Sequence, residues 1–413
     1  MGTLTTDGRW LFLTRMARMF AYGFLSVILV LYLAQVGLST PQIGLLLTLT
    51  LIGDTAISLF LTTRADRIGR RRMLLAGAAL MVFAGAFFAV TKNYMWLVIT
   101  ATIGVISPSG NEVGPFLSIE QAALAQLLPA TRRTQVFAWY NLVGSFSTAL
   151  GALSGGVLAQ VLRNMGFAPL DSYRAVILGY AGLGFVLIFL FTRLSDQVEV
   201  PPAQSFSVSS KSSRWGLTRS GKAVFKLSVL FSLDAFAGGF VIQSIVAYWF
   251  HVRFGVEPAM LGAIFFGANI LAGISALSAA WIARRIGLIN TMVFSHLPSN
   301  FLLILVPFMP SLGLAIAFLL LRFSISQMDV PTRQSYTMAV VDPEERSAAA
   351  GITGVARTLG ASLAPVFAGI LLSSTGLIGL PFIISGGLKI IYDVGLYWNF
   401  RSLKPPEETK SEA

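Results

Sequence analysis

Residues 65–72 read Ala65-Asp66-Arg67-Ile68-Gly69-Arg70-Arg71-Arg72, and this short polar segment separates two long apolar runs. A weaker copy, Ala283-Arg284-Arg285-Ile286-Gly287, separates two later apolar runs. The shared positions include a charge and a glycine as well as apolar letters, which favours a duplicated unit over a chance alignment. The sequence therefore predicts two related halves.

Apolar runs long enough to cross a membrane fill the chain on both sides of these segments. Hydrophobic residues make up 55% of the 413 residues and charged residues only 12%, whereas soluble domains carry about a quarter charged residues. A spanning helix needs about 20 mostly apolar residues. On that criterion we predict an all-α membrane protein with twelve transmembrane helices, near 11–34, 41–63, 73–91, 94–117, 134–161, 173–193, 226–250, 258–283, 290–309, 311–330, 346–374 and 379–399.

The basic residues indicate the topology. The formal net charge is +12, and the 30 Lys and Arg stand at the ends of apolar runs rather than along one polar face. This distribution argues against nucleic-acid binding. When the spans alternate from a cytoplasmic N-terminus, most Lys and Arg fall on the cytoplasmic side, as the positive-inside rule requires. We expect both termini in the cytoplasm and a monomeric, multi-pass protein in the lipid bilayer of the cell (plasma or inner) membrane.

The residue types exclude several chemistries. The chain has no cysteine, so it offers neither a disulfide framework nor a thiolate metal site. The two histidines, His251 and His296, are too few and too far apart in sequence for a zinc site. The sequence has no Gly-x-x-x-x-Gly-Lys-Ser/Thr phosphate loop, which argues against an ATP-driven pump. We expect no metal, no cofactor and no enzymatic activity.

The longest polar stretch lies near the middle of the chain. It contains Pro201-Pro202 and a serine-rich run with several basic residues, a composition typical of a linker. We predict an N-terminal six-helix bundle over 1–194, a cytoplasmic linker over 195–225, a C-terminal six-helix bundle over 226–400 and a cytoplasmic polar tail over 401–413.

With these features the chain resembles the major facilitator superfamily. Residues 66–72 match the hallmark loop of that superfamily, which lies between the second and third spans. The resemblance implies two pseudo-symmetric six-helix bundles with both termini cytoplasmic. Thr62 stands where the family loop usually begins with glycine, and residues 151–156 lack the proline of the antiporter-type motif. Residues 329–334 and 342–346 resemble bacterial drug-exporter-like members.

The resemblance also implies a function. It predicts a secondary active transporter that moves a small organic solute by alternating access. We expect proton-coupled efflux, an antiport whose partners are the small-molecule substrate and protons. Proton-coupled or facilitative uptake of an organic anion or sugar is the alternative within this class. A non-transporting receptor or scaffold with the same fold is the alternative outside it.

Acidic side chains inside the predicted spans are candidates for proton coupling. A charge at mid-bilayer costs about 3 kcal/mol by insertion scales, so it tends to face a cavity or a partner. The candidates are Asp54, Glu112 and Asp234, because a carboxylate exposed first to one side and then to the other can carry a proton across. A structural salt bridge, such as one between Asp234 and Arg18, is the alternative.

Basic and amide side chains in the spans are candidates for a substrate cavity. An arginine can fork onto a carboxylate or phosphate, so Arg322 and Arg357 suggest an anionic or zwitterionic solute, with pairing to Asp329 or to acids of the first half as the alternative. Lys389 and Asp393 have the i,i+4 spacing that predicts an ion pair on one helix face. The full set of cavity candidates is Arg18, Arg322, Arg357, Gln243, Asn269 and Asn141.

Two further groups are expected at the cytoplasmic ends of spans. The superfamily resemblance implies that Asp66 faces the start of the eleventh span, where the helix dipole favours an anion. The expected conformational switch loop comprises Asp66, Arg67, Gly69, Arg70 and Arg71. The expected cytoplasmic charge network comprises Glu120, Arg133, Asp329, Arg333 and Arg346.

Overall fold

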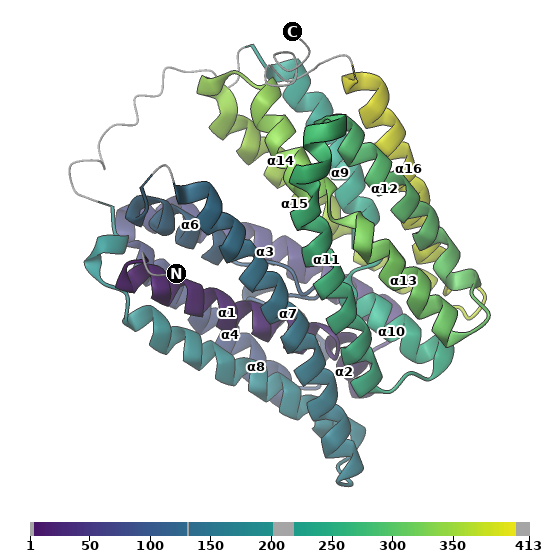
Figure 1. Ribbon diagram of the computed structural model, residues 1–413. Helices are drawn as coiled ribbons and strands as arrows, with labels where there is room; N and C mark the ends of the chain where they lie inside the picture. The colour runs from purple at the N-terminus through teal and green to yellow at the C-terminus, as the bar shows by residue number, and fades with distance from the viewer. Residues whose placement is uncertain (1–3, 130–131, 201–218, 402–413) are drawn as a thin grey trace. The chain divides into compact units, whose positions relative to one another are not determined.

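The protein is built from helices, as the computed structural model in Figure 1 shows. The structure describes residues 4–129, 132–200 and 219–401. Most of the predicted linker and the predicted polar tail beyond residue 401 lie outside these ranges. Within them every regular element is an α-helix or a short 3-10 turn.

Helices occur in each of the twelve predicted spans, but they make ten or eleven candidate membrane spans. Ten spans are long and apolar enough, two of them made of consecutive helices over Gly221–Phe254 and Leu312–Val340, and α1 with α2, bent by 44° at their junction, makes an eleventh when counted as one span. The first half comprises α1 (Thr6–Ser26), α2 (Leu29–Val36), α3 (Thr40–Ile68), α4 (Arg70–Val90), α5 (Tyr94–Ile103), α6 (Phe116–Leu127), α7 (Arg133–Asn164) and α8 (Pro169–Thr192). The second comprises α9 (Gly221–Gly239), α10 (Gln243–Phe254), α11 (Pro258–Ile286), α12 (Leu288–Leu305), α13 (Leu312–Ser326), α14 (Asp329–Val340), α15 (Arg346–Leu371) and α16 (Leu380–Phe400).

The fourth predicted span is not one continuous helix. The helix predicted over 94–117 ends as α5 at Ile103, and α6 begins only at Phe116. Gly110 and Gly114 in the intervening segment have φ of +71° and +79°, a backbone region that favours glycine and cannot continue an α-helix. Pro108 adds a residue that disfavours helix. The segment therefore places non-helical backbone, including Glu112, between two apolar helices.

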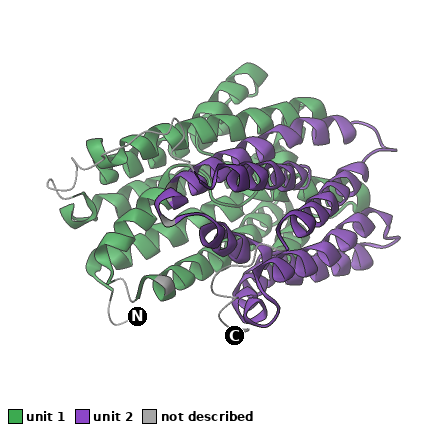
Figure 2. Ribbon diagram, turned by 90° about the horizontal axis from the view of Figure 1, so that it is seen from above, with its two compact units in different colours: residues 1–209, 242–267 green, residues 210–241, 268–413 purple. Residues whose placement is uncertain are grey.

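The described residues form two compact units, coloured separately in Figure 2. Unit 1 comprises residues 1–209 and 242–267, and unit 2 comprises residues 210–241 and 268–413. Helix α9 belongs to unit 2 and α10 to unit 1.

The two copies of the polar segment fold alike. Gly69 separates α3 from α4 with φ of +119°, and Gly287 separates α11 from α12 with φ of +84°. Each glycine N–H donates to an alanine carbonyl four residues earlier, Ala65 and Ala283, at 2.9 Å. A side chain at these φ values would be strained. The sequence repeat thus corresponds to one local structure made twice.

Helix packing follows the same repeat within each unit. In unit 1, α1 packs on α7 and α4 packs on α8, while in unit 2, α9 packs on α15 and α12 packs on α16. Glycines permit the first pairing in both units, since a Cβ on Gly151 would collide with the Phe20 carbonyl and one on Gly360 with the Ser232 carbonyl. Small residues allow such close backbone approach in lipid.

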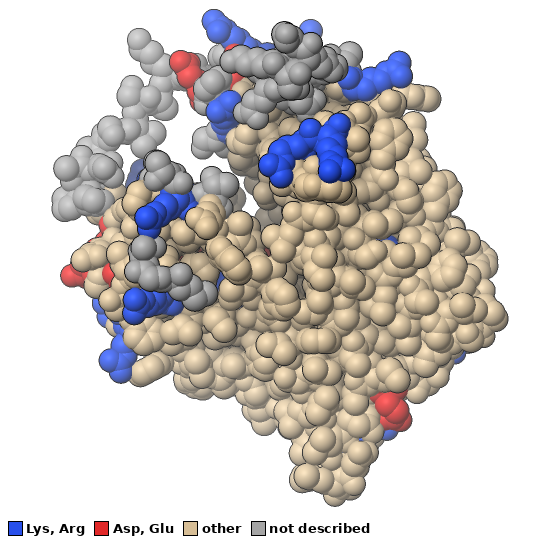
Figure 3. Space-filling view, in the orientation of Figure 1, with Lys and Arg blue, Asp and Glu red and all other residues tan. Residues whose placement is uncertain are grey.

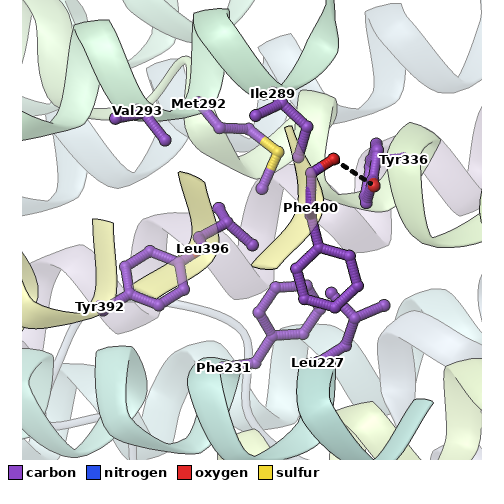
Figure 4. Packing of buried hydrophobic residues seen from close by; sticks show 9 residues of the cluster. All are labelled: Leu227, Phe231, Ile289, Met292, Val293, Tyr336, Tyr392, Leu396 and Phe400. Carbon is purple, nitrogen blue, oxygen red and sulfur yellow. Dashed lines mark hydrogen bonds between the residues drawn. The ribbon is translucent and has the colours of Figure 1, made fainter. Parts of the chain in front are cut away.

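Apolar side chains fill unit 2 between α9, α12, α14 and α16, as Figure 4 shows. The Tyr336 hydroxyl donates to the Phe400 carbonyl at 3.4 Å beside this core. The clustered residues are Leu227, Phe231, Ile289, Met292, Val293, Tyr336, Tyr392, Leu396 and Phe400.

Large apolar side chains also cover outward surfaces. Phe185 of α8 is 62% exposed and Trp398 of α16 is 72% exposed. In the view of Figure 3, charged side chains are sparse over most of the face and gather near its edges. Such a surface suits a hydrocarbon solvent, in which apolar side chains need no cover.

Candidate functional site

A buried ion cluster lies in unit 1 between α1 and the segment after α5. Arg18 donates to Glu120 at 2.7 and 2.8 Å and to Glu112 at 3.1 Å. Arg15, one helical turn earlier, also pairs with Glu112. Two arginines thus balance two glutamates in surroundings where an unpaired charge would be costly.

Glu120 is the most enclosed member of this cluster. Its side chain is fully buried, and besides Arg18 it accepts hydrogen bonds from Thr14 at 2.7 Å and from the Tyr140 hydroxyl. Glu112 is 18% exposed, and its Oε2 has no hydrogen-bond partner among the described residues. One glutamate is therefore fully engaged and the other partly available.

Asp54 lies apart from these ion pairs. It sits in α3, is 7% exposed, and accepts the Gly114 backbone N–H at 2.7 Å. Among the described residues no Lys, Arg or His lies within ion-pair distance of Asp54. It is a buried carboxylate without a cation partner.

The remaining unit 1 candidates lie around the same helices. The Gln243 amide donates to the Ser26 hydroxyl at 2.8 Å. Asn141 is exposed on α7, and its Oδ1 lies 3.5 Å from Arg15 Nη2. Arg18 is fully buried in its ion pairs, so its charge is already matched.

A second cluster lies in unit 2 around Asp234. Asp234 Oδ1 pairs with Lys389 of α16, and Asp234 Oδ2 lies 3.1 Å from Arg333 of α14. Arg333 also pairs with Asp329 at 2.9 Å. Asp329 is thus paired with Arg333, and not with Arg322 or Arg357, which was the alternative considered for those arginines.

His296 joins this cluster and changes a predicted pair. The Lys389–Asp393 ion pair is wrong: Lys389 turns to Asp234, and Asp393 bonds His296 Nδ1 at 2.8 Å and Asn300 Nδ2 at 2.9 Å. Sequence reasoning considered His296 only as a metal ligand. The spacing of His296 and Asn300, four residues apart in an apolar helix, could have indicated that both side chains share a buried polar partner.

Arg322 and Arg357 lie inside the predicted spans of unit 2 and form no ion pair with any described residue. Arg322 of α13 is 8% exposed, and Arg357 of α15 is partly buried. The Nε atom of each is buried with no hydrogen-bond partner. Both side chains lie close enough to Asp234 and Asp329 to interact with them electrostatically.

The switch-loop residues lie at the junction of α3 and α4. Asp66 is exposed and pairs with Arg70 at 2.8 Å, while Arg67 is exposed and Arg71 half-buried. Glu199, which sequence reasoning missed, accepts the backbone N–H groups of Arg70 at 2.6 Å and Arg71 at 3.1 Å. A carboxylate therefore caps the first turn of α4, where the helix dipole favours negative charge. The contact predicted between Asp66 and the eleventh span stays a prediction.

The residues of the expected cytoplasmic charge network occupy different environments. Glu120 and Arg333 are buried in the ion clusters of units 1 and 2 respectively. Arg133 and Arg346 are exposed at the starts of α7 and α15. Asn269, the last cavity candidate, is half-buried in α11.

The sequence is similar to known proteins over most of its length. A family model described as Major Facilitator Superfamily matches residues 11–363. An uncharacterized membrane protein of Saccharomyces cerevisiae, YJR124C, is 32% identical over 404 residues, which covers 91% of this chain and 90% of the yeast protein.

Two further likenesses are weaker in sequence. The quinolone resistance protein NorA of Staphylococcus aureus is 26% identical over 145 residues, covering 35% of this chain and 36% of NorA. The crystal structure of a bacterial homologue of the human lysosomal transporter Spinster, in an inward-facing and occupied conformation, matches with a TM-score of 0.75. That match has 14% identity and covers 95% of this chain and 96% of the other, so it shows the fold alone.

Proposed function

This chain belongs to the major facilitator superfamily, and from that premise we propose that it exports a small organic solute in exchange for protons by alternating access. The family and its structural neighbours make the chain a multi-pass membrane transporter rather than an enzyme. Direction, coupling ion and solute are the parts that the proposal adds.

Asp54 is the observation that carries the proton coupling. A charged carboxylate without a cation partner is costly in low-dielectric surroundings, so such a group is readily held as the neutral acid. When water reaches Asp54 from one side of the membrane, hydration stabilises the charged carboxylate and the proton can leave. Asp54 can therefore bind and release a proton without first breaking an ion pair.

The other two predicted coupling residues suit that task less well. Glu112 is paired with Arg15 and Arg18, and Asp234 is paired with Lys389 and Arg333. Protonating either carboxylate would leave buried cations without their anions, which is strongly unfavourable. We assign to these two a role in holding the arginines and lysine in place, with Glu112 able to respond to Asp54 through its nearby charge.

The resemblance to NorA supports the direction of transport. NorA is named for resistance to quinolones, and resistance fits outward movement of a toxic compound. The matched portion covers about a third of each chain. Export of an organic compound is accordingly the first direction to test.

The test is a proteoliposome assay with an imposed pH gradient. Vesicles acidic inside should accumulate a transported solute, and a protonophore should abolish the accumulation. Asp54→Asn should remove accumulation yet retain exchange of labelled for unlabelled solute, because exchange needs no net proton movement. Asp171→Asn, at an exposed pair with Arg174, is the matched control and should behave as wild type.

Persistent accumulation by Asp54→Asn would refute the assignment of the carrier. Accumulation of solute in vesicles that are alkaline inside, where protons and solute move inward together, would indicate symport instead of antiport. A panel containing a quinolone and labelled compounds of each charge keeps the assay independent of any single solute.

A further inference from the structure

We propose that unit 2 binds an organic oxyanion, a carboxylate or phosphate ester, and that Arg322 and Arg357 supply the guanidinium groups that hold it. The inference deepens the proposed transport function by naming the chemical class of its solute. It rests on that function only for the statement that the bound anion is also transported.

Arg322 is the central observation. Its side chain is 8% exposed in α13, and it forms no hydrogen bond or ion pair with any described residue, with its Nε buried and unpartnered. The guanidinium lies 5.0 Å from the ring centre of Phe323. A buried guanidinium that no protein anion satisfies is costly. Its position is therefore suited to an anion brought by a ligand.

Arg357 extends the same feature from a second helix. It belongs to α15, its Nε is buried without a partner, and none of the described ion pairs includes it. Like Arg322, it interacts electrostatically with Asp234 and Asp329. Two helices thus place guanidinium groups without ion pairs near one acidic cluster.

The acids of this cluster are already engaged by other groups. Asp234 is held by Lys389 and Arg333, and Asp329 is held by Arg333. Asp393 accepts hydrogen bonds from Asn300 and bonds His296. Three carboxylates therefore face four permanent cations, Lys389, Arg322, Arg333 and Arg357, before any proton on His296 is counted. An anionic ligand would neutralise the surplus positive charge.

The buried arginines of unit 1 differ from Arg322 and Arg357 in their ion pairing. Its buried arginines are all matched by acids among the described residues, Arg15 and Arg18 by Glu112 and Glu120 and Arg70 by Asp66. Guanidinium groups bind carboxylate and phosphate through paired N–H donors, a geometry that neither a neutral sugar nor a cation can use. Unit 2 should therefore select oxyanions over neutral or cationic analogues.

The experiment measures binding to the purified full chain in nanodiscs by calorimetry, so that its outcome does not depend on transport. The probes share one ring system and differ in charge: 2-naphthoate and 2-naphthyl phosphate, neutral 2-naphthamide, and cationic 2-naphthylmethylamine. At least one of the two anions should bind, and the amide and amine should not bind at the same concentrations. Comparison of the two anions decides between carboxylate and phosphate.

Substitutions then locate the site. Arg322→Gln and Arg357→Gln should each weaken anion binding by about tenfold or more, because each removes one partner of a desolvated charge pair. Arg322→Lys keeps the charge but loses the fork, so it should bind weakly as well, and it serves if Arg322→Gln does not fold. Arg284→Gln, at an exposed arginine of α11 in the same unit, should leave binding unchanged.

Several results would overturn the proposal. They are failure of both anions to bind, equal binding of naphthamide and naphthoate, or unchanged affinity in both glutamine variants. Anion binding without proton-coupled accumulation would refute the proton antiport and leave this inference standing. Proton-coupled accumulation of a cation alone, with no anion binding, would do the reverse.

Discussion

His296 Nδ1 lies 2.8 Å from Asp393 Oδ1, and this contact ties α12 to α16 in the interior of unit 2. Asp393 has no exposed surface and His296 only 3%. Asn300, one turn after His296, donates to the second oxygen of the same carboxylate at 2.9 Å. One acid thus fastens two consecutive turns of α12.

Removing this carboxylate should destabilise the protein strongly. We predict that Asp393→Ala lowers the free energy of unfolding by about 3 kcal/mol, because His296 and Asn300 would be left buried without their acceptor. The measurement is thermal unfolding in detergent followed by tryptophan fluorescence. Asp171→Ala removes a half-exposed ion pair and should cost less than about 1 kcal/mol. Equal losses in the two variants would contradict the structural role of Asp393.

The same residues show where sequence reasoning reached its limit. Lys389 and Asp393 satisfy the i,i+4 rule, but a surface pair of that kind contributes only about 0.3–0.5 kcal/mol. Inside unit 2, partners from α9 and α12 are available to each residue, and they replace the local pair. Sequence spacing identifies which side chains share a helix face and carries no information on which other helix faces them.

Features that depend only on neighbouring residues in the sequence were easier to predict than side-chain pairing. The turns at Gly69 and Gly287 follow from glycine between charged helix ends, and the apolar runs locate most of the spans, although the span predicted over 311–330 continues to Val340. The helix predicted over 94–117 ends at Ile103, since a long apolar run gives little sign of lost helix. Among the candidate residues, Asp54, Asp234 and Arg322 were predictable as intramembrane charges, but their pairing depends on tertiary contacts.

Substitutions of Glu112 and Glu120 should separate an effect on transport from an effect on stability. Glu120 is fully buried with Arg18, Thr14 and Tyr140 around it, and Glu112 is 18% exposed with a free Oε2. We predict that Glu120→Gln lowers the free energy of unfolding by about 3 kcal/mol. Glu112→Gln should cost less, about 2 kcal/mol, because Arg18 keeps its pair with Glu120 and only Arg15 loses its anion.

The transport readout should show the opposite order. Glu112→Gln removes a charge that interacts with Asp54 and should change the pH dependence of solute accumulation in proteoliposomes. Glu120→Gln protein that survives purification should keep the wild-type pH dependence at reduced yield. If both variants lose stability equally and neither alters the pH dependence, the distinction between the two glutamates is wrong.

Glu199 should control the order of the first turn of α4. Its carboxylate accepts the N–H groups of Arg70 and Arg71, and caps of this kind contribute about 0.5–2 kcal/mol. We predict that Glu199→Ala speeds amide hydrogen exchange at Arg70 and Arg71. Glu199→Asp should be intermediate, since its shorter side chain still offers a carboxylate. Exchange rates unchanged from wild type in Glu199→Ala would show that the cap contributes nothing.

Two glycines of α15 provide a matched test of helix packing. A Cβ on Gly360 would collide with the Ser232 carbonyl oxygen of α9, whereas a Cβ on Gly354, nearly two turns earlier, would meet no atom within 4 Å. Gly360→Ala should therefore force α9 and α15 apart and lower the free energy of unfolding by about 1–3 kcal/mol, the usual cost of overpacking.

Gly354→Ala should have the opposite sign. Alanine favours a helix over glycine by about 1 kcal/mol, and the open space around Gly354 imposes no steric penalty. Thermal unfolding of both variants beside wild type measures the difference directly. Because the two substitutions add the same methyl group to the same helix, helix propensity cancels between them. A lower unfolding temperature for Gly360→Ala than for Gly354→Ala would then measure only the contact with Ser232, and equal temperatures would mean that α9 and α15 do not approach at Gly360.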